Sequence, residues 1–196
     1  MKKALLLVSV LIISVMTTAC INNLAVQELN NKAAAFMEEG DYQNAIERLK
    51  SSLDLDSTIF ETHYNLAVAY TKAEEYADAI KVFNDAIKIN PDFADTYYSL
   101  AVCEENLAAD IGNSIVSVDD EGNIQKITPA EEEEPSSEDK LSDNNFNYMI
   151  ELLKSAEKHY NIYLDKTSNQ SDTSEVDERI KEINKRIEEL TTQRSE

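Results

Sequence analysis

Apolar residues recur at helical spacing over most of the chain, and they fall into pairs of stripes separated by short polar turns. Between residues 60 and 93 the first stripe ends at Tyr70 and the second begins at Tyr76, with a polar turn over residues 72–75. Asn90-Pro91 ends the second helix, because proline disfavours helical geometry in the residue before it. Two helices joined in this way predict an αα-hairpin.

The pattern repeats every 34 residues along the chain. Ala33, Ala67 and Ala101 are spaced by this period, as are several pairs of apolar positions between them. Small side chains such as alanine allow two helix backbones to approach closely. The other apolar positions spaced by 34 residues are Tyr42 with Tyr76, Ala45 with Ala79, Ile46 with Ile80, Leu53 with Ile87, Leu55 with Ile89, and Leu66 with Leu100. The sequence therefore predicts an all-α fold of repeated helical hairpins.

These residues resemble the tetratricopeptide repeat. The first repeat, Val26 to Ile59, has Lys32 and Ser57 where the family usually has an apolar residue and a proline. The third opens at Tyr97 and has Glu104 where an aromatic residue is usual. The second repeat, Phe60 to Phe93, has the family's residues at the family's spacing: Leu66, Ala67, Tyr70, Tyr76, Ala79, Phe83, Ala86 and Pro91. The resemblance implies a short α-solenoid of helix hairpins over residues 26–108.

An acidic insertion over residues 109–145 interrupts the third repeat. It contains 11 acidic and 2 basic residues and no aromatic residue, and Glu131 to Glu134 form a block of like charge. Residues 114–118 and 123–127 flank a polar turn and could pair as a β-hairpin. A like-charged block resists compaction, and an isolated hairpin is only marginally stable. Two alternatives therefore remain for the insertion, a short hairpin or disorder.

Helical periodicity returns over residues 146–196. Ala156 and Tyr160 repeat the spacing of Ala79 and Phe83, so we interpret this segment as the displaced second helix of the third repeat. A polar linker over residues 167–174 leads to a last helix over residues 175–192. Its apolar positions are Val176, Ile180, Ile183, Ile187 and Leu190. The last helix is either a cap of the solenoid or, over barely two heptads, a coiled-coil strand.

The first 19 residues have the layout of an export signal. Lys2 and Lys3 precede an apolar run from Ala4 to Val15, which is too short for a comfortable membrane span. Thr17 to Cys20 resembles the lipobox of bacterial lipoproteins, although leucine is usual where Thr17 stands. The resemblance implies a lipid-modified Cys20, a tether over residues 20–25 and a protein of the bacterial cell envelope. We expect it in the outer membrane, facing the periplasm.

Charge and composition exclude several classes of function. The 196 residues include 18 Lys and Arg against 38 Asp and Glu, which gives a net charge of −20 and argues against nucleic-acid binding. Helix formers dominate, and only 3 Gly and 3 Pro occur. Such a composition suits helices and disfavours a turn-rich β-sandwich.

Residues with catalytic or metal-binding chemistry are few. His63 and His159 lie at helical positions without metal spacing, so we expect partly buried structural side chains. Cys103 lies among apolar residues and is expected to be buried. The Asp119–Asn123 segment lacks the alternating ligands of a calcium loop. We therefore predict neither an enzyme nor a bound metal or cofactor, and no small-molecule substrate.

The resemblance places a ligand groove on the concave face, along the first helix of each repeat. Some members of the family clamp a partner's terminal carboxylate with Lys, Arg and Asn, but here only Asn65 matches that pattern, and Asn30, Asp95 and Ser99 stand at other clamp positions. We therefore predict no such clamp, and a partner segment of basic or mixed charge. The expected groove residues are Asn30, Met37, Tyr64, Asn65, Val68, Lys72, Tyr98 and Val102.

Two functional hypotheses follow from these features. The first is a membrane-anchored protein–protein interaction adaptor of the cell envelope, which binds a segment of another protein in the groove. The alternative is a structural subunit of an outer-membrane assembly or secretion complex. A large permanent interface would distinguish the second from the first.

Overall fold

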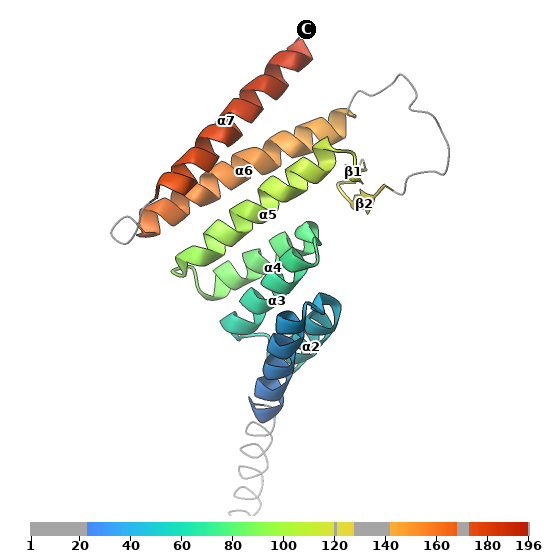
Figure 1. The fold of residues 1–196 in the computed structure, drawn as a ribbon, viewed down its shortest axis with the longest axis vertical. Helices are drawn as coiled ribbons and strands as arrows, with labels where there is room; N and C mark the ends of the chain where they lie inside the picture. Colours follow the sequence, from blue (N-terminus) through green and yellow to red (C-terminus); the bar gives the residue numbers. More distant parts are fainter. Residues whose placement is uncertain (1–22, 120, 128–141, 168–172, 196) are drawn as a thin grey trace, which may run out of the picture. The chain divides into compact units, whose positions relative to one another are not determined.

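The computed structural model describes residues 23–119, 121–127, 142–167 and 173–195 (Figure 1). These residues fall into two compact units, one ending at Glu74 and one beginning at Glu75. The export signal, Cys20 and the Glu131–Glu134 block lie outside the described residues. Within the described ranges, no helix has the length and apolar character needed to cross a bilayer.

The N-terminal unit consists of three successive helices. Residues 23–39 are helical, and α2 (Tyr42–Leu55) and α3 (Phe60–Lys72) follow. Gly40 turns the chain at φ +77°, a conformation that favours glycine, and the Asp41 side chain accepts a hydrogen bond from a backbone N–H in the first turn of α2. α2 packs against α3. The buried apolar residues are Val26, Ala33, Ala45, Ile46, Leu49, Leu66, Ala67, Ala69 and Tyr70.

The C-terminal unit contains α4 (Tyr76–Ile89), α5 (Ala94–Gly112), α6 (Asp143–Thr167) and α7 (Ser174–Ser195). α5 and α6 lie side by side, α4 packs against α5, and α7 packs against α6 (Figure 1). The core lies between α5, α6 and α7, and its buried members include Leu107, Ile111, Met149, Leu153, Ala156, Tyr160, Val176, Ile183 and Leu190. Because α7 buries its apolar stripe against this core, the prediction of a C-terminal capping helix is confirmed.

A β-hairpin occupies the first part of the insertion. β1 (Val116–Val118) pairs antiparallel with β2 (Ile124–Lys126), so the hairpin alternative holds for these residues. Both valines of β1 are buried against α5 and α6, and the Val118 N–H donates to Asn145 Oδ1 at 2.7 Å. Packing on two helices supplies the stability that an isolated hairpin lacks.

Asp119 organises the turn of the hairpin. Its Oδ1 accepts hydrogen bonds from the backbone N–H groups of Glu121 and Asn123, at 2.9 Å and 2.8 Å. The Asn123 and Gln125 side-chain amides also donate to this carboxylate. Its oxygens are therefore engaged in closing the turn.

Three element boundaries differ from those predicted. α5 continues past residue 108 to Gly112, because Ile111 adds a fully buried side chain to the core. The chain is already helical at residues 23–25, where a tether was expected, and Val26 then begins the buried face. α6 retains Thr167, whose hydroxyl donates to the Tyr163 carbonyl, and α7 runs from Ser174 to Ser195. The linker and the insertion are correspondingly shorter than expected.

Candidate functional site

A small hollow lies in the N-terminal unit, with a volume of about 190 Å³. Four of the eight predicted groove residues line it together, from the helix over residues 23–39 and from α3. Those four are Asn30, Met37, Asn65 and Val68, and Ala33, Ala34 and Leu49 complete the wall. The walls are therefore mainly apolar, with two amide side chains among them.

The Asn30 amide is engaged inside the unit. Its Nδ2 donates to the Val26 carbonyl at 2.9 Å and to Ser52 Oγ at 2.8 Å, and its Oδ1 accepts from Thr62 Oγ1 at 3.2 Å. Ser52 and Thr62 are fully buried, so Asn30 satisfies two hydroxyl groups that would otherwise lack partners. Asn30 thus shapes the hollow, and Asn65, whose side chain is exposed, is the amide that can face a ligand.

Tyr64 and Lys72 are on α3 but do not line this hollow. The Tyr64 ring stacks on Phe60 with 5.9 Å between ring centroids, and Lys72 is exposed in the last turn of α3. Both are within one or two helical turns of Asn65 and Val68 along the same helix. The prediction that they contact the same partner stays a prediction.

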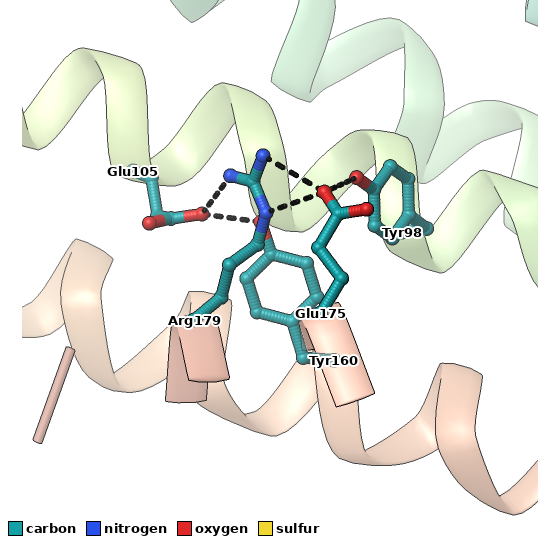
Figure 2. Close-up of polar contacts among 5 residues, drawn as sticks. All are labelled: Tyr98, Glu105, Tyr160, Glu175 and Arg179. Carbon is teal, nitrogen blue, oxygen red and sulfur yellow. Dashed lines mark hydrogen bonds and ion pairs between the residues drawn. The ribbon is translucent and has the colours of Figure 1, made fainter. Parts of the chain in front are cut away.

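Tyr98 and Val102, the remaining predicted groove residues, pack against the core of the C-terminal unit. The Tyr98 ring meets Tyr160 edge-on at 5.7 Å and contacts Tyr163 at 5.3 Å. Its hydroxyl is 3.5 Å from Glu175 of α7 (Figure 2). α7 therefore lies over the face of α5 that carries this tyrosine.

A polar cluster joins α5, α6 and α7 around the Arg179 guanidinium (Figure 2). Arg179 donates to Glu105 of α5 at 3.3 Å and to Glu175 of α7 at 3.4 Å. The Tyr160 hydroxyl of α6 donates a short hydrogen bond to the same Glu105 oxygen. Burial, followed by the hydrogen bond to Glu105, raises the pKa of Tyr160, so its phenol remains a donor at neutral pH.

A second polar cluster is buried between α5 and α6. Glu104 is only 3% exposed, its Oε1 accepts from Ser155 Oγ at 2.7 Å, and its Oε2 accepts from His159 Nδ1 at 2.8 Å. A buried carboxylate is costly unless it is fully hydrogen-bonded, and these two donors meet that need. His159 is thus a partly buried structural residue, as expected. His63 is also partly buried, and its Nε2 is 2.9 Å from the Ser57 carbonyl oxygen.

Sequence reasoning identified Glu104 as a departure from the repeat pattern but missed its partners. The partners of Glu104 could have been predicted from the antiparallel register of α5 and α6. Ala101 and Ala156 are both fully buried, and the sequence pattern makes them the counterparts of Ala67 and Ala79 in the second repeat. An antiparallel pair with these alanines at its crossing brings Glu104 within one or two turns of Ser155 and His159.

A larger hollow of about 310 Å³ borders the Arg179 cluster. Ala108, Ala109 and Gly112 of α5 form one wall, and Met149 and Leu153 of α6 form another. Ile183 and Arg186 of α7 close the third side. Over the described part of the chain, no group of three His, Cys, Asp or Glu residues could hold a metal ion.

The tetratricopeptide repeat family matches residues 36–104. The structure is similar to the second tetratricopeptide domain of human RPAP3 in complex with the HSP70 peptide SGPTIEEVD, with a TM-score of 0.56, 14% identity, and coverage of 83% of this chain and 98% of that one. The chain has a tetratricopeptide-repeat fold.

Two other solved tetratricopeptide domains have the same fold. The domain of Arabidopsis OM64 has a TM-score of 0.56 and 13% identity, and the match covers 84% of this chain and 98% of that chain. The Sgt2 domain from Aspergillus fumigatus has a TM-score of 0.55 and 15% identity, and the match covers 85% of this chain and 82% of that chain. No curated protein has a matching sequence. Tetratricopeptide domains generally mediate protein–protein interactions, and the RPAP3 domain binds a peptide segment.

Proposed function

We propose that this protein is a membrane-anchored interaction adaptor of the bacterial cell envelope, which binds a segment of another protein in the hollow of its N-terminal unit. The observation that carries the proposal is the apolar hollow bounded by Met37, Asn65 and Val68, within a fold that generally mediates protein–protein interactions. Its volume of about 190 Å³ suits one or two side chains of an extended or helical segment.

The chemistry of the segment differs from that of the RPAP3 ligand. That ligand, SGPTIEEVD, has acidic residues near its end, whereas the present chain has a net charge of −20. Of the clamp positions, only Asn65 matches the residue that the family has at that place, and no Lys or Arg stands at the positions of Asn30, Asp95 and Ser99. We therefore propose a partner segment of basic or mixed charge, because like charges oppose association.

Substitution of a hollow residue should weaken partner binding strongly. A photoreactive side chain at position 65 identifies the bound segment, and Val68→Glu should then reduce capture by about tenfold or more, because a carboxylate in an apolar wall needs hydration. The matched control is Leu55→Glu, which places the same charge on an exposed apolar side chain of the same unit, outside the hollow.

Two outcomes would contradict the adaptor proposal. Equal capture by Val68→Glu, Tyr64→Ala and the wild type would exclude the hollow as the binding surface. A stoichiometric complex that survives high salt and is indifferent to these substitutions would favour a structural subunit of an assembly complex instead.

Lipid attachment at Cys20 should hold the mature chain on the membrane. Several acyl chains on one cysteine give stable anchoring, whereas one chain binds only marginally. We expect Cys20→Ala to move the protein into the soluble envelope fraction and to abolish incorporation of labelled palmitate. Cys103→Ala is the matched control, because Cys103 is buried in α5 and should not affect labelling. Membrane retention of unlabelled Cys20→Ala would refute the anchor.

A further inference from the structure

The α5–α6 pair presents a guanidinium site that the chain fills with its own Arg179. Glu105 supplies a carboxylate, and the hydroxyl of Tyr160 donates to that carboxylate and fixes its direction (Figure 2). The Tyr98 ring borders the site from α5, and its hydroxyl reaches Glu175 of α7. A carboxylate with an adjacent aromatic surface suits the planar guanidinium of arginine.

The helix that supplies Arg179 covers the site incompletely. Along α7 three side chains, Val176, Ile183 and Leu190, are buried, and they recur every seven residues. The adjoining hollow of about 310 Å³ lies between α7 and the walls formed by α5 and α6. Because unfilled space at an interface forfeits dispersion contacts, α7 is a suboptimal occupant of this surface.

Small residues of α5 create that hollow. Ala108 and Ala109 contribute only small side chains to the wall, Gly112 contributes none and lies beside Met149 of α6, and Ile183 of α7 does not fill the remaining space. The wall also includes Met149, a long flexible side chain that adapts to ligands of different shape. This surface therefore accommodates a bulkier apolar side chain than α7 presents.

We propose that the α5–α6 face is a helix-binding site, that α7 is its internal occupant, and that a partner helix displaces α7. The partner presents an arginine to Glu105 and, one turn later, an aromatic or other bulky apolar residue to the hollow. This proposal rests on the protein-binding function proposed above and adds a second surface, under the control of the chain's own C-terminal helix. A tethered occupant is present at high effective concentration, so only a partner with better contacts succeeds.

The test uses the full chain and a labelled peptide. The peptide has the sequence of residues 173–195 with Ile183→Phe, so that it retains the arginine and enlarges the side chain at the hollow. We expect this peptide to bind the Arg179→Gln chain about tenfold more tightly than the wild-type chain, because the internal helix then leaves Glu105 without its cationic partner. The Glu105→Gln chain should lose most of this affinity, as should a peptide with Arg179→Gln.

Hydrogen exchange is an independent test, because the peptide would not alter amide exchange in α7 if α7 were only a permanent cap. In the wild type, α7 amides should exchange faster than those of α5 and α6, and the peptide should accelerate them further while α5 and α6 remain protected. Equal protection of α7 and α5, or the absence of peptide binding to Arg179→Gln, would overturn the proposal. Concentration-dependent dimers of Arg179→Gln would overturn it as well, by assigning the site to a second copy of the chain.

Failure of this proposal is separable from failure of the proposed function. The Val68→Glu experiment probes the N-terminal unit and does not involve α7. A protein that loses its partner with Val68→Glu, but does not bind the peptide, would be an adaptor with a permanent C-terminal cap.

Discussion

Glu104→Ala is expected to lower the free energy of unfolding of the C-terminal unit by about 3 kcal/mol. Glu104 is buried between α5 and α6, and it accepts hydrogen bonds from Ser155 Oγ and His159 Nδ1. The alanine variant leaves both donors inside the helix interface without their acceptor and adds an unfilled space. Urea denaturation of the full chain, followed by circular dichroism, measures the change.

Glu104→Gln is the matched control for this experiment. Glutamine preserves the volume of the side chain and one carbonyl acceptor, so the expected loss is about 1 kcal/mol. If Glu104→Ala were as stable as Glu104→Gln, the hydrogen bonds to Ser155 and His159 would contribute nothing to the packing of α5 on α6. A substitution on the exposed face of α6, such as Lys158→Ala, should leave stability nearly unchanged.

The helices themselves could be predicted from the sequence, because helical periodicity is a local property. The 34-residue period predicted α2, α3, α4 and the start of α5, and the structure has helices there with the expected apolar faces buried. The spacing of Ala156 and Tyr160 likewise predicted α6 beyond the insertion, and both residues are fully buried. The prediction of an all-α tetratricopeptide-type fold is confirmed.

The end of α5 and the docking of the hairpin could not be predicted in the same way. Both depend on contacts between segments that are distant in sequence: Ile111 is buried in the core formed with α6 and α7, and β1 packs on α5 and α6. The acidic composition of residues 109–145 did not indicate these packed segments, because it is a property of the whole segment and is dominated by the charged block that follows β1. Valines at positions 116 and 118 were the local sign of a buried strand face.

The candidate site was predicted only in part, because periodicity specifies which side of a helix is buried and not which residue it meets. The helical pattern predicted that the first helix of each repeat contributes residues to one groove, and in the N-terminal unit one hollow is indeed lined by Asn30, Met37, Asn65 and Val68. Tyr98 and Val102 share the corresponding face of α5, yet there α6 and α7 supply the neighbours: the Tyr98 ring contacts Tyr160 and Tyr163 of α6, and its hydroxyl meets Glu175 of α7. The Arg179 contact with Glu105 spans 74 residues, and nothing in the local pattern of either helix indicates it.

Tyr160→Ala is expected to cost about 4 kcal/mol, because it removes a fully buried aromatic side chain from the core of the C-terminal unit. The substitution also removes the edge-on ring contact with Tyr98 and the hydrogen bond to Glu105. Tyr160→Phe separates these contributions, since it preserves the ring and loses only the hydroxyl, at an expected cost of about 1.5 kcal/mol. Chemical denaturation of the two variants gives both values.

The phenylalanine variant also tests how the Arg179 cluster is held. Without the phenol, the Glu105 carboxylate retains Arg179 as a partner but loses the donor that fixes its direction, so the α7 amides should exchange faster than in the wild type. Tyr163→Phe is the control, because Tyr163 contacts the Tyr98 ring from the same helix and takes no part in the hydrogen bond between Tyr160 and Glu105. If Tyr160→Phe and Tyr163→Phe changed α7 exchange equally, the hydroxyl of Tyr160 would have no specific role in positioning Glu105, and the buried apolar residues Val176, Ile183 and Leu190 would account for the docking of α7.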